Sequence, residues 1–227
     1  MRAFAAALLL AGAPALAFAQ QTPPTSPPPA PQTSARPVLV VRPVSGFVVD
    51  ARGVLAKFGQ RPTIATAFNV PASDLPGPGL GGTVGAHVYP VRFGRVALGL
   101  GAELTMARRS RQPLDDAGEP TGPMLKAQVY SIAPQVSLNF GHRNGWSFVS
   151  GGIGSASFET WVETGENPDR RVRSINYGGG ARWFTSPHLA FTVDLRFHTI
   201  AAGLADGALL ERPRQRLMML SAGISVR

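Results

Sequence analysis

The strongest constraint on the fold is an alternation of apolar and polar residues with a period of two, which is cleanest over residues 189–198. The odd positions carry large apolar side chains: Leu189, Phe191, Val193, Leu195 and Phe197. The even positions include three ionisable side chains, Asp194, Arg196 and His198. Successive side chains of a β-strand point to opposite faces, so this segment is predicted to be a strand with one apolar and one polar face.

The same alternation recurs along the chain, and no segment after residue 20 shows a sustained helical period. It predicts an all-β fold of eight strands, over residues 45–58, 79–90, 94–108, 125–140, 146–161, 171–184, 189–200 and 215–227. Two of these, 45–58 and 146–161, show no clear phase.

The predicted connections alternate in length. Three are short, at residues 91–93, 141–145 and 185–188, and the pair Asn144-Gly145 suits a tight hairpin turn. Four are long, at residues 59–78, 109–124, 162–170 and 201–214. In an up-and-down antiparallel barrel this places all short turns at one end and all long loops at the other, which is typical of bacterial outer-membrane barrels.

The N-terminal region predicts export. Arg2 precedes an apolar run that ends in Ala17-Phe18-Ala19, which is the layout of a secretory signal peptide over residues 1–19. Residues 20–44 are rich in Pro, Ser and Thr and are predicted to be a disordered periplasmic segment. Residues 45–227 then form the barrel. The sequence has no Cys, which excludes both a lipid-anchored cysteine and a disulfide framework.

A soluble barrel and a membrane barrel differ in which face of the wall meets water. A soluble secreted barrel that binds a small apolar ligand would place the large apolar side chains inside. Here the polar parity is rich in small residues that suit the narrow interior of an eight-stranded barrel, such as Gly99, Gly101, Gly178 and Gly180. Four aromatic residues towards strand ends on the apolar parity predict interfacial girdles: Tyr130, Phe140, Trp183 and Phe184. We therefore predict a monomeric barrel in the bacterial outer membrane.

Two groups of charged residues are candidate functional residues. The first lies on the polar parity and is predicted to pair inside a lumen too narrow for a wide channel: Asp50, Arg52, Glu103, Arg182, Asp194 and Arg196. The second lies in or beside the long loops: Arg108, Arg109, Arg111, Arg170, Arg171, Arg212 and Arg214. These arginines either contact the phosphates of lipopolysaccharide or are simply solvated. The net charge of +9 does not predict nucleic-acid binding, because the arginines are dispersed and the chain is exported.

Two stretches resemble a known family. YGGGARWFTSPHLAFTVDLRFHT (Tyr177–Thr199) and FVSGGIG (Phe148–Gly154) are similar to small outer-membrane β-barrels of the OmpA-like and OmpX-like kind. The resemblance implies a structural or envelope-interaction role, contact with outer-membrane lipid and lipopolysaccharide, and insertion by the barrel assembly machinery. The chain departs from the family at Val226-Arg227, where such barrels usually end in an aromatic residue.

No motif for a cofactor, a metal ion or a catalytic nucleophile is present in the sequence. The stretch from His198 to Leu204 is distantly similar to the His-x-Ser-Asn-Ala-Gly stretch of outer-membrane lipid A deacylases, which implies a barrel enzyme as the alternative function. Ile200 occupies the position of the nucleophilic Ser, and Thr199 should point to the opposite face from His198. The residues therefore favour a barrel without a catalytic site.

Overall fold

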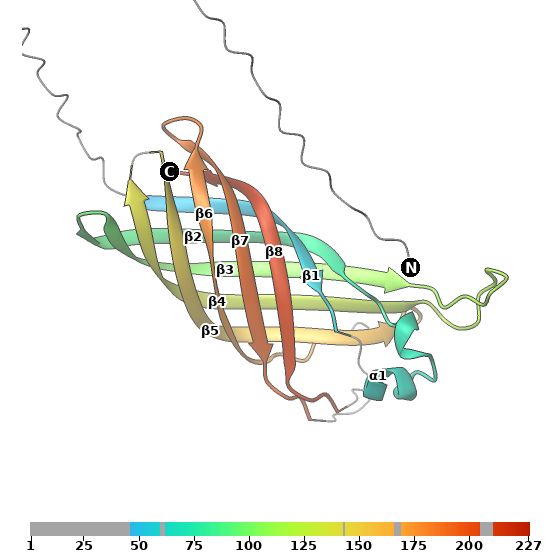
Figure 1. Cartoon of the computed structure of the whole chain (residues 1–227). Helices are drawn as coiled ribbons and strands as arrows, with labels where there is room; N and C mark the ends of the chain where they lie inside the picture. Colours follow the sequence, from blue (N-terminus) through green and yellow to red (C-terminus); the bar gives the residue numbers. More distant parts are fainter. Residues whose placement is uncertain (1–45, 60–61, 143, 166–168, 205–210) are drawn as a thin grey trace, which may run out of the picture. The chain divides into compact units, whose positions relative to one another are not determined.

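The computed structural model describes residues 46–59, 62–142, 144–165, 169–204 and 211–227. They form one closed barrel of eight antiparallel strands, in which each strand pairs with its sequence neighbours and β1 pairs with β8 (Figure 1). The strands are β1 (Phe47–Lys57), β2 (Gly79–Phe93), β3 (Val96–Arg111), β4 (Leu125–His142), β5 (Gly145–Val162), β6 (Val172–Phe184), β7 (Leu189–Ile200) and β8 (Gln215–Val226). The signal peptide and the Pro-rich segment predicted at residues 1–44 lie outside the described residues.

The predicted alternation of short and long connections is confirmed. The short connections β2–β3, β4–β5 and β6–β7 lie at one end of the barrel, together with the start of β1 and the end of β8. We call this the turn end. The opposite end carries the connections 58–78, 112–124, 163–171 and 201–214 and is called the loop end. In bacterial outer-membrane barrels the short turns face the periplasm.

The position of the first turn was predicted wrongly. Residues 91–93 belong to β2, and the turn is formed by Gly94 and Arg95, with Gly94 at a φ of 58° that favours glycine. The pairing of β2 with β3 shifts by one residue between Val88 and Val91. Pro90 lies in this bulge, where its missing N–H costs no ladder hydrogen bond.

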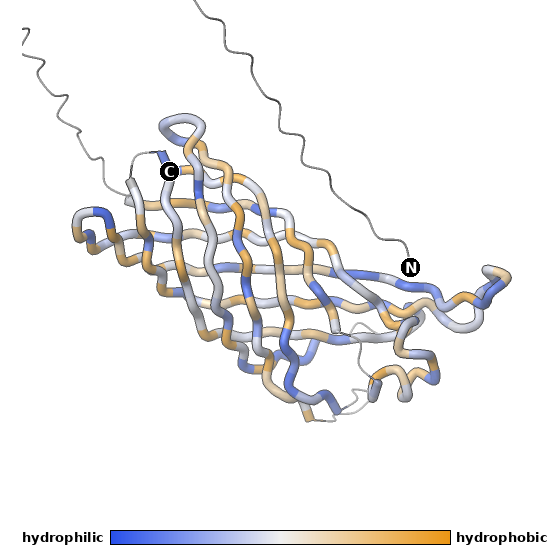
Figure 2. Tube along the Cα trace, in the orientation of Figure 1, coloured by the Kyte–Doolittle hydropathy of each residue, from blue (hydrophilic) through white to orange (hydrophobic). Residues whose placement is uncertain are grey.

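The wall of the barrel is apolar outside and polar inside. Figure 2 shows hydropathy alternating along the strands, and large apolar side chains of every strand are exposed on the outer face, such as Val84, Leu100 and Leu195. The structure also settles the two strands without a clear phase. Asp50 and Arg52 of β1 face the lumen while Lys57 faces outward, and in β5 the inward residues include Trp146.

The lumen is filled by three layers of side chains. At the turn end a small apolar cluster comprises Val48, Tyr89, Ala97 and Trp146, with Phe184 packed against it. Charged residues occupy the middle. Towards the loop end lies a larger apolar cluster: Val54, Ala56, Phe58, Ala107, Ala127, Val129, Ala156, Phe158, Ile200, Leu217 and Met219. The prediction that Phe184 belongs to an outer girdle is therefore wrong, because its ring lies 4.8 Å from that of Trp146 inside the barrel.

The connection 58–78 contains a short helix, α1 (Pro62–Ala67), and a 3-10 turn, η1 (Ala72–Asp74), which the sequence pattern did not predict. Six residues are too few to display a helical period. Ile64, Ala65 and Leu75 pack on Leu125 and Val162 at the loop ends of β4 and β5. Among the described residues, no helix is long and apolar enough to cross a bilayer.

Candidate functional site

The part of the charged layer nearest the turn end joins opposite sides of the barrel. Arg182 of β6 donates hydrogen bonds from Nε and Nη2 to the two carboxylate oxygens of Asp50 of β1, at 3.2 and 2.7 Å. The hydroxyl of Ser225 donates to Asp50. The guanidinium of Arg182 also lies 4.3 Å from the centre of the Phe148 ring. All four side chains are buried, so this pair is shielded from solvent.

The adjoining part of the layer shares two carboxylates between two arginines. Arg52 of β1 pairs with Glu103 of β3 and with Asp194 of β7, the latter at 2.5 Å. Arg196 pairs with the same two carboxylates, at 2.8 Å to Asp194 and 3.3 Å to Glu103. Arg196 further donates to three neutral oxygens, those of Gln135, Asn176 and Ser150.

The structure thus brings together all six residues of the first candidate group. Three guanidiniums and three carboxylates balance in charge, and each has at least one partner of opposite sign. A buried charge without a partner would cost several kcal/mol, so pairing is what allows these residues inside the wall. Sequence reasoning missed the supporting amides Gln135 and Asn176, although both stand on the inward parity of their strands.

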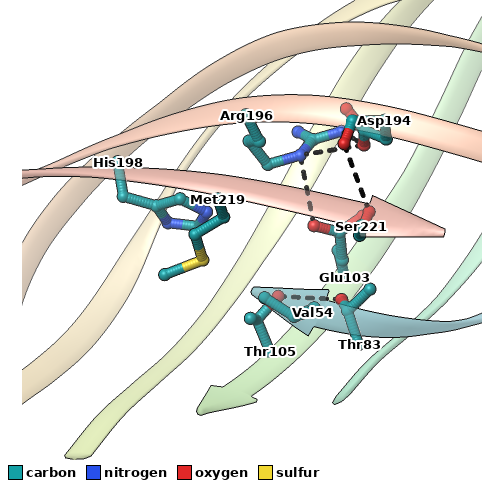
Figure 3. A pocket seen from close by; sticks show the side chains of 9 residues that line it. All are labelled: Val54, Thr83, Glu103, Thr105, Asp194, Arg196, His198, Met219 and Ser221. Carbon is teal, nitrogen blue, oxygen red and sulfur yellow. Dashed lines mark hydrogen bonds and ion pairs between the residues drawn. The ribbon is translucent and has the colours of Figure 1, made fainter. Parts of the chain in front are cut away.

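A small cavity lies between the charged layer and the larger apolar cluster (Figure 3). The space open to the centre of a water molecule is about 10 Å³, enough for one water. Its lining includes Glu103, Asp194 and Arg196 on one side and Val54 and Met219 on the other. A cavity of this size cannot hold a drug-sized apolar ligand, and it lies under an apolar outer wall. The apolar outer wall argues against the soluble, ligand-binding reading.

His198 lies in the lining of this cavity. It is 2% exposed, and neither ring nitrogen has a hydrogen-bond partner among the described residues. Thr199 lies on the outer parity and Ile200 is buried, so no hydroxyl from either position is directed at the histidine. The geometry does not supply the nucleophile-base pair of a deacylase. In the described part of the chain, no group of three or more His, Cys, Asp or Glu side chains could hold a metal ion.

The structure separates the second candidate group into exposed and buried members. Arg108, Arg109 and Arg111 belong to β3 rather than to a loop, and all three are exposed, as are Arg171 and Arg214. Arg212 is only 1% exposed, and Arg170 is half-buried. Both donate to the carboxylate of Glu159 of β5, Arg170 at 3.1 Å and Arg212 at 2.9 Å.

This buried triad ties two loop-end connections to β5. Arg212 also donates to the carbonyl oxygen of Phe158, and Arg170 donates to that of Leu204 at 2.5 Å. Burial lowers the pKa of Arg212, and the charge of Glu159 opposes that effect. Arg170 and Arg212 therefore stabilise the arrangement of the loops, and their prediction as residues on the lipid-contacting surface is wrong.

Sequence reasoning missed three exposed cations on the outward parity at the loop end: Lys57 of β1, Arg173 of β6 and Arg216 of β8. The sequence pattern does indicate them, because each stands two residues closer to the loop end than an outward apolar residue and so lies on the same face of its strand. Two further cations there are paired. Lys126 lies 2.8 Å from Glu163, and Arg171 lies 3.0 Å from Asp169. The hydrogen bond and the charge of Asp169 raise the pKa of Arg171.

Comparison with known proteins gives no match to any family model and no match among curated proteins. Among solved structures, Neisserial surface protein A superposes with a TM-score of 0.51 at 14% identity, covering 80% of this chain and 97% of that chain. Ail, the attachment invasion locus protein of Yersinia pestis, gives a TM-score of 0.42 at 13% identity over 79% of this chain and 95% of that one. The outer membrane protease OmpT of Escherichia coli gives 0.40 at 8% identity, covering 66% of this chain and 64% of OmpT.

The closed eight-stranded barrel, its apolar outer wall and the similarity to Neisserial surface protein A agree with one another. An outer wall of large apolar side chains is stable only where it meets hydrocarbon. The chain therefore has the fold of a small bacterial outer-membrane β-barrel.

Proposed function

We propose that this protein is a non-catalytic outer-membrane barrel whose loop end binds the phosphate groups of lipopolysaccharide. The observation that carries the proposal is a set of four exposed cations on the outward parity at the loop ends of four strands: Lys57, Arg108, Arg173 and Arg216. None of the four forms an ion pair with another described residue, so each is available to an external anion.

The position of these cations supports a lipid phosphate as the ligand. Two residues towards the turn end on the same face of each strand stands an exposed apolar side chain, namely Leu55, Met106, Ile175 or Met218. The change from apolar to cationic side chains marks the loop-end edge of the hydrocarbon-facing wall. The phosphate groups of lipid A lie at that level, and arginine binds phosphate through two parallel hydrogen bonds.

The lumen supports a role without catalysis or a wide channel. Apolar side chains close it above and below the charged layer, and the three arginines of that layer are engaged by carboxylates. The surfaces left for interaction are the outer wall and the two ends of the barrel. We further propose that the barrel is monomeric and is inserted by the barrel assembly machinery. The unbroken outward alternation of β8, with Leu220, Ile224 and Val226, supports this route.

The test compares two adjacent arginines of β3. Arg108 faces outward, whereas Arg109 is also exposed but stands on the lumen parity. The triple variant R108Q/R173Q/R216Q is compared with R109Q and the wild type in detergent, with lipopolysaccharide, with its dephosphorylated form and with inorganic phosphate. We expect lipopolysaccharide to raise the thermal unfolding midpoint of the wild type and of R109Q, and dephosphorylation to remove most of that rise.

We expect the triple variant to lose the rise as well, because a ligand stabilises a folded protein only when its concentration exceeds the Kd, and the triple variant should bind lipopolysaccharide more weakly. An equal rise in the triple variant would contradict the proposal. A rise caused by inorganic phosphate alone, as large as that from lipopolysaccharide, would also contradict it, because the site would then recognise phosphate free of the lipid.

A further inference from the structure

The carboxylates of this chain are distributed very unevenly along the barrel axis. Of the 13 Asp and Glu residues, three lie in the lumen layer and none lies in the turn-end segments 46–49, 88–97, 138–148, 183–191 and 224–227. Of the other ten, eight are described and lie at the loop end or in its connections: Asp74, Asp115, Asp116, Glu119, Glu159, Glu163, Asp169 and Glu211. Glu166 and Asp206 lie outside the described residues. Asp50 lies three residues after Phe47, where β1 begins at the turn end, and it is buried and paired with Arg182.

The turn end nevertheless carries cations. Arg92 and Arg95 flank the β2–β3 turn, are exposed, and form no ion pair with any described residue. Arg227 is engaged differently, since its Nε donates to the carbonyl oxygen of Pro187 at 2.6 Å and its guanidinium lies 3.8 Å from the centre of the Phe184 ring. Arg92 and Arg95 are thus the two cations of this rim, within the described residues, that are open to an external anion.

A ring of exposed aromatic side chains marks the level of these two arginines. Its members are Phe47, Phe93, Phe140, Trp183 and Phe191, all at the turn ends of their strands. Aromatic residues in this position lie at the headgroup level of a bilayer. Phe93 is 71% exposed and faces outward, and it stands between Arg92 and the Gly94-Arg95 turn. Arg92 pairs with the inward residue Ala97 and therefore stands on the lumen parity, but its side chain is exposed at the rim, so both arginines lie at the level of the aromatic ring.

We propose that this basic rim, formed by Arg92 and Arg95 beside Phe93, binds the phosphate groups of anionic phospholipids in the leaflet at the turn end. No Asp or Glu side chain stands in the turn-end segments, so none competes there for the guanidiniums or repels the phosphate. A soluble anionic partner is a poorer fit, because Phe93 inserts into the bilayer and brings the arginines to the lipid headgroups. The inference concerns the opposite end from the proposed lipopolysaccharide contacts and does not rest on them.

The experiment measures lipid selectivity at the barrel wall. The wild type, R92Q/R95Q and R109Q/R111Q are reconstituted into phosphatidylcholine vesicles that contain either spin-labelled phosphatidylglycerol or spin-labelled phosphatidylcholine. Electron paramagnetic resonance then gives the association constant of each labelled lipid relative to the bulk lipid. The two double variants lose the same charge, but one loses it at the turn end and the other at the loop end.

We expect the wild type and R109Q/R111Q to favour phosphatidylglycerol, and R92Q/R95Q to lose up to about fivefold of that preference per arginine removed. Added salt should weaken the preference, since the contacts are ionic and partly exposed. An unchanged preference in R92Q/R95Q would overturn the proposal. The proposal would also be overturned if the wild type showed no lipid preference but sedimented with peptidoglycan, and R92Q/R95Q did not. That result would assign the rim to a cell-wall ligand.

Discussion

Arg182 reaches across the lumen from β6 to hold Asp50 of β1 by two hydrogen bonds of 3.2 and 2.7 Å. These two strands do not pair with each other in the sheet, since β7 and β8 lie between them by the shorter way around the barrel. The contact therefore acts as a crosslink between opposite walls. It encloses one charge of each sign in a part of the barrel that neither the membrane nor bulk water solvates.

Removing one partner of this crosslink should be costly. We expect D50N to lower the free energy of unfolding by about 3 to 5 kcal/mol, because Arg182 would be left buried without its carboxylate. The double variant D50L/R182M removes both charges and should recover most of that loss. Urea unfolding in a bilayer or micelle measures both values, and a double variant no more stable than D50N would show that the pair is not the source of the loss.

The triad at the loop end should hold the connection 201–214 in place. Because Glu159 accepts from both Arg170 and Arg212, E159Q leaves two arginines without their shared anion. We predict faster cleavage of this connection by a protease of broad specificity, while the barrel still shifts on heating in a gel. The matched control is E163Q, whose partner Lys126 is partly exposed, so its cleavage should resemble that of the wild type.

Glycine at position 180 is required by the close approach of neighbouring side chains. A Cβ there would press on the carbonyl oxygen of Val193 and lie 2.9 Å from Cζ of Phe148, the ring that supports Arg182. We expect G180A to destabilise the barrel by about 1 to 3 kcal/mol through overpacking. At Gly151 the nearest atom would be 3.5 Å away, so G151A serves as the control in the same unfolding experiment and should change stability much less.

The two apolar clusters of the lumen should each block ion flow by themselves. We expect the wild type to show no stepwise conductance in a planar bilayer. W146A should also stay closed, because the cluster around Phe58 and Phe158 still seals the loop-end side. Regular conductance steps in either protein would mean that the lumen contains a continuous aqueous path.

Much of the fold could be predicted from the sequence because the period-two pattern is a direct record of which side chains face lipid. Residues 189–198 show this best, and the structure places Leu195 outside and Asp194 inside as the pattern requires. The pattern failed where the chain leaves the regular ladder. Pro90 introduces a bulge that moves the first turn to Gly94, and a six-residue helix in 58–78 is too short to be periodic.

The candidate site was only partly predictable, for a different reason. Parity alone assigns Asp50 and Arg182 to the same interior, but it cannot say that they meet across the barrel. Proximity in the sequence groups Arg212 with exposed Arg214, whereas in the structure Arg212 donates a hydrogen bond to Glu159. The outward cations Lys57 and Arg216 lie near the loop ends of β1 and β8. They were missed because candidate charges were sought only on the polar parity and among the loop arginines.

The most direct test of this account is a nitroxide scan of residues 189–198 in a bilayer. The chain has no cysteine, so each position can be replaced by a single labelled cysteine without a background variant. We predict that labels at the odd positions collide readily with oxygen dissolved in the hydrocarbon and poorly with a water-soluble nickel complex. Labels at the even positions should be shielded from both reagents. Odd positions that collide with the nickel complex as readily as a label in free solution would contradict the transmembrane barrel.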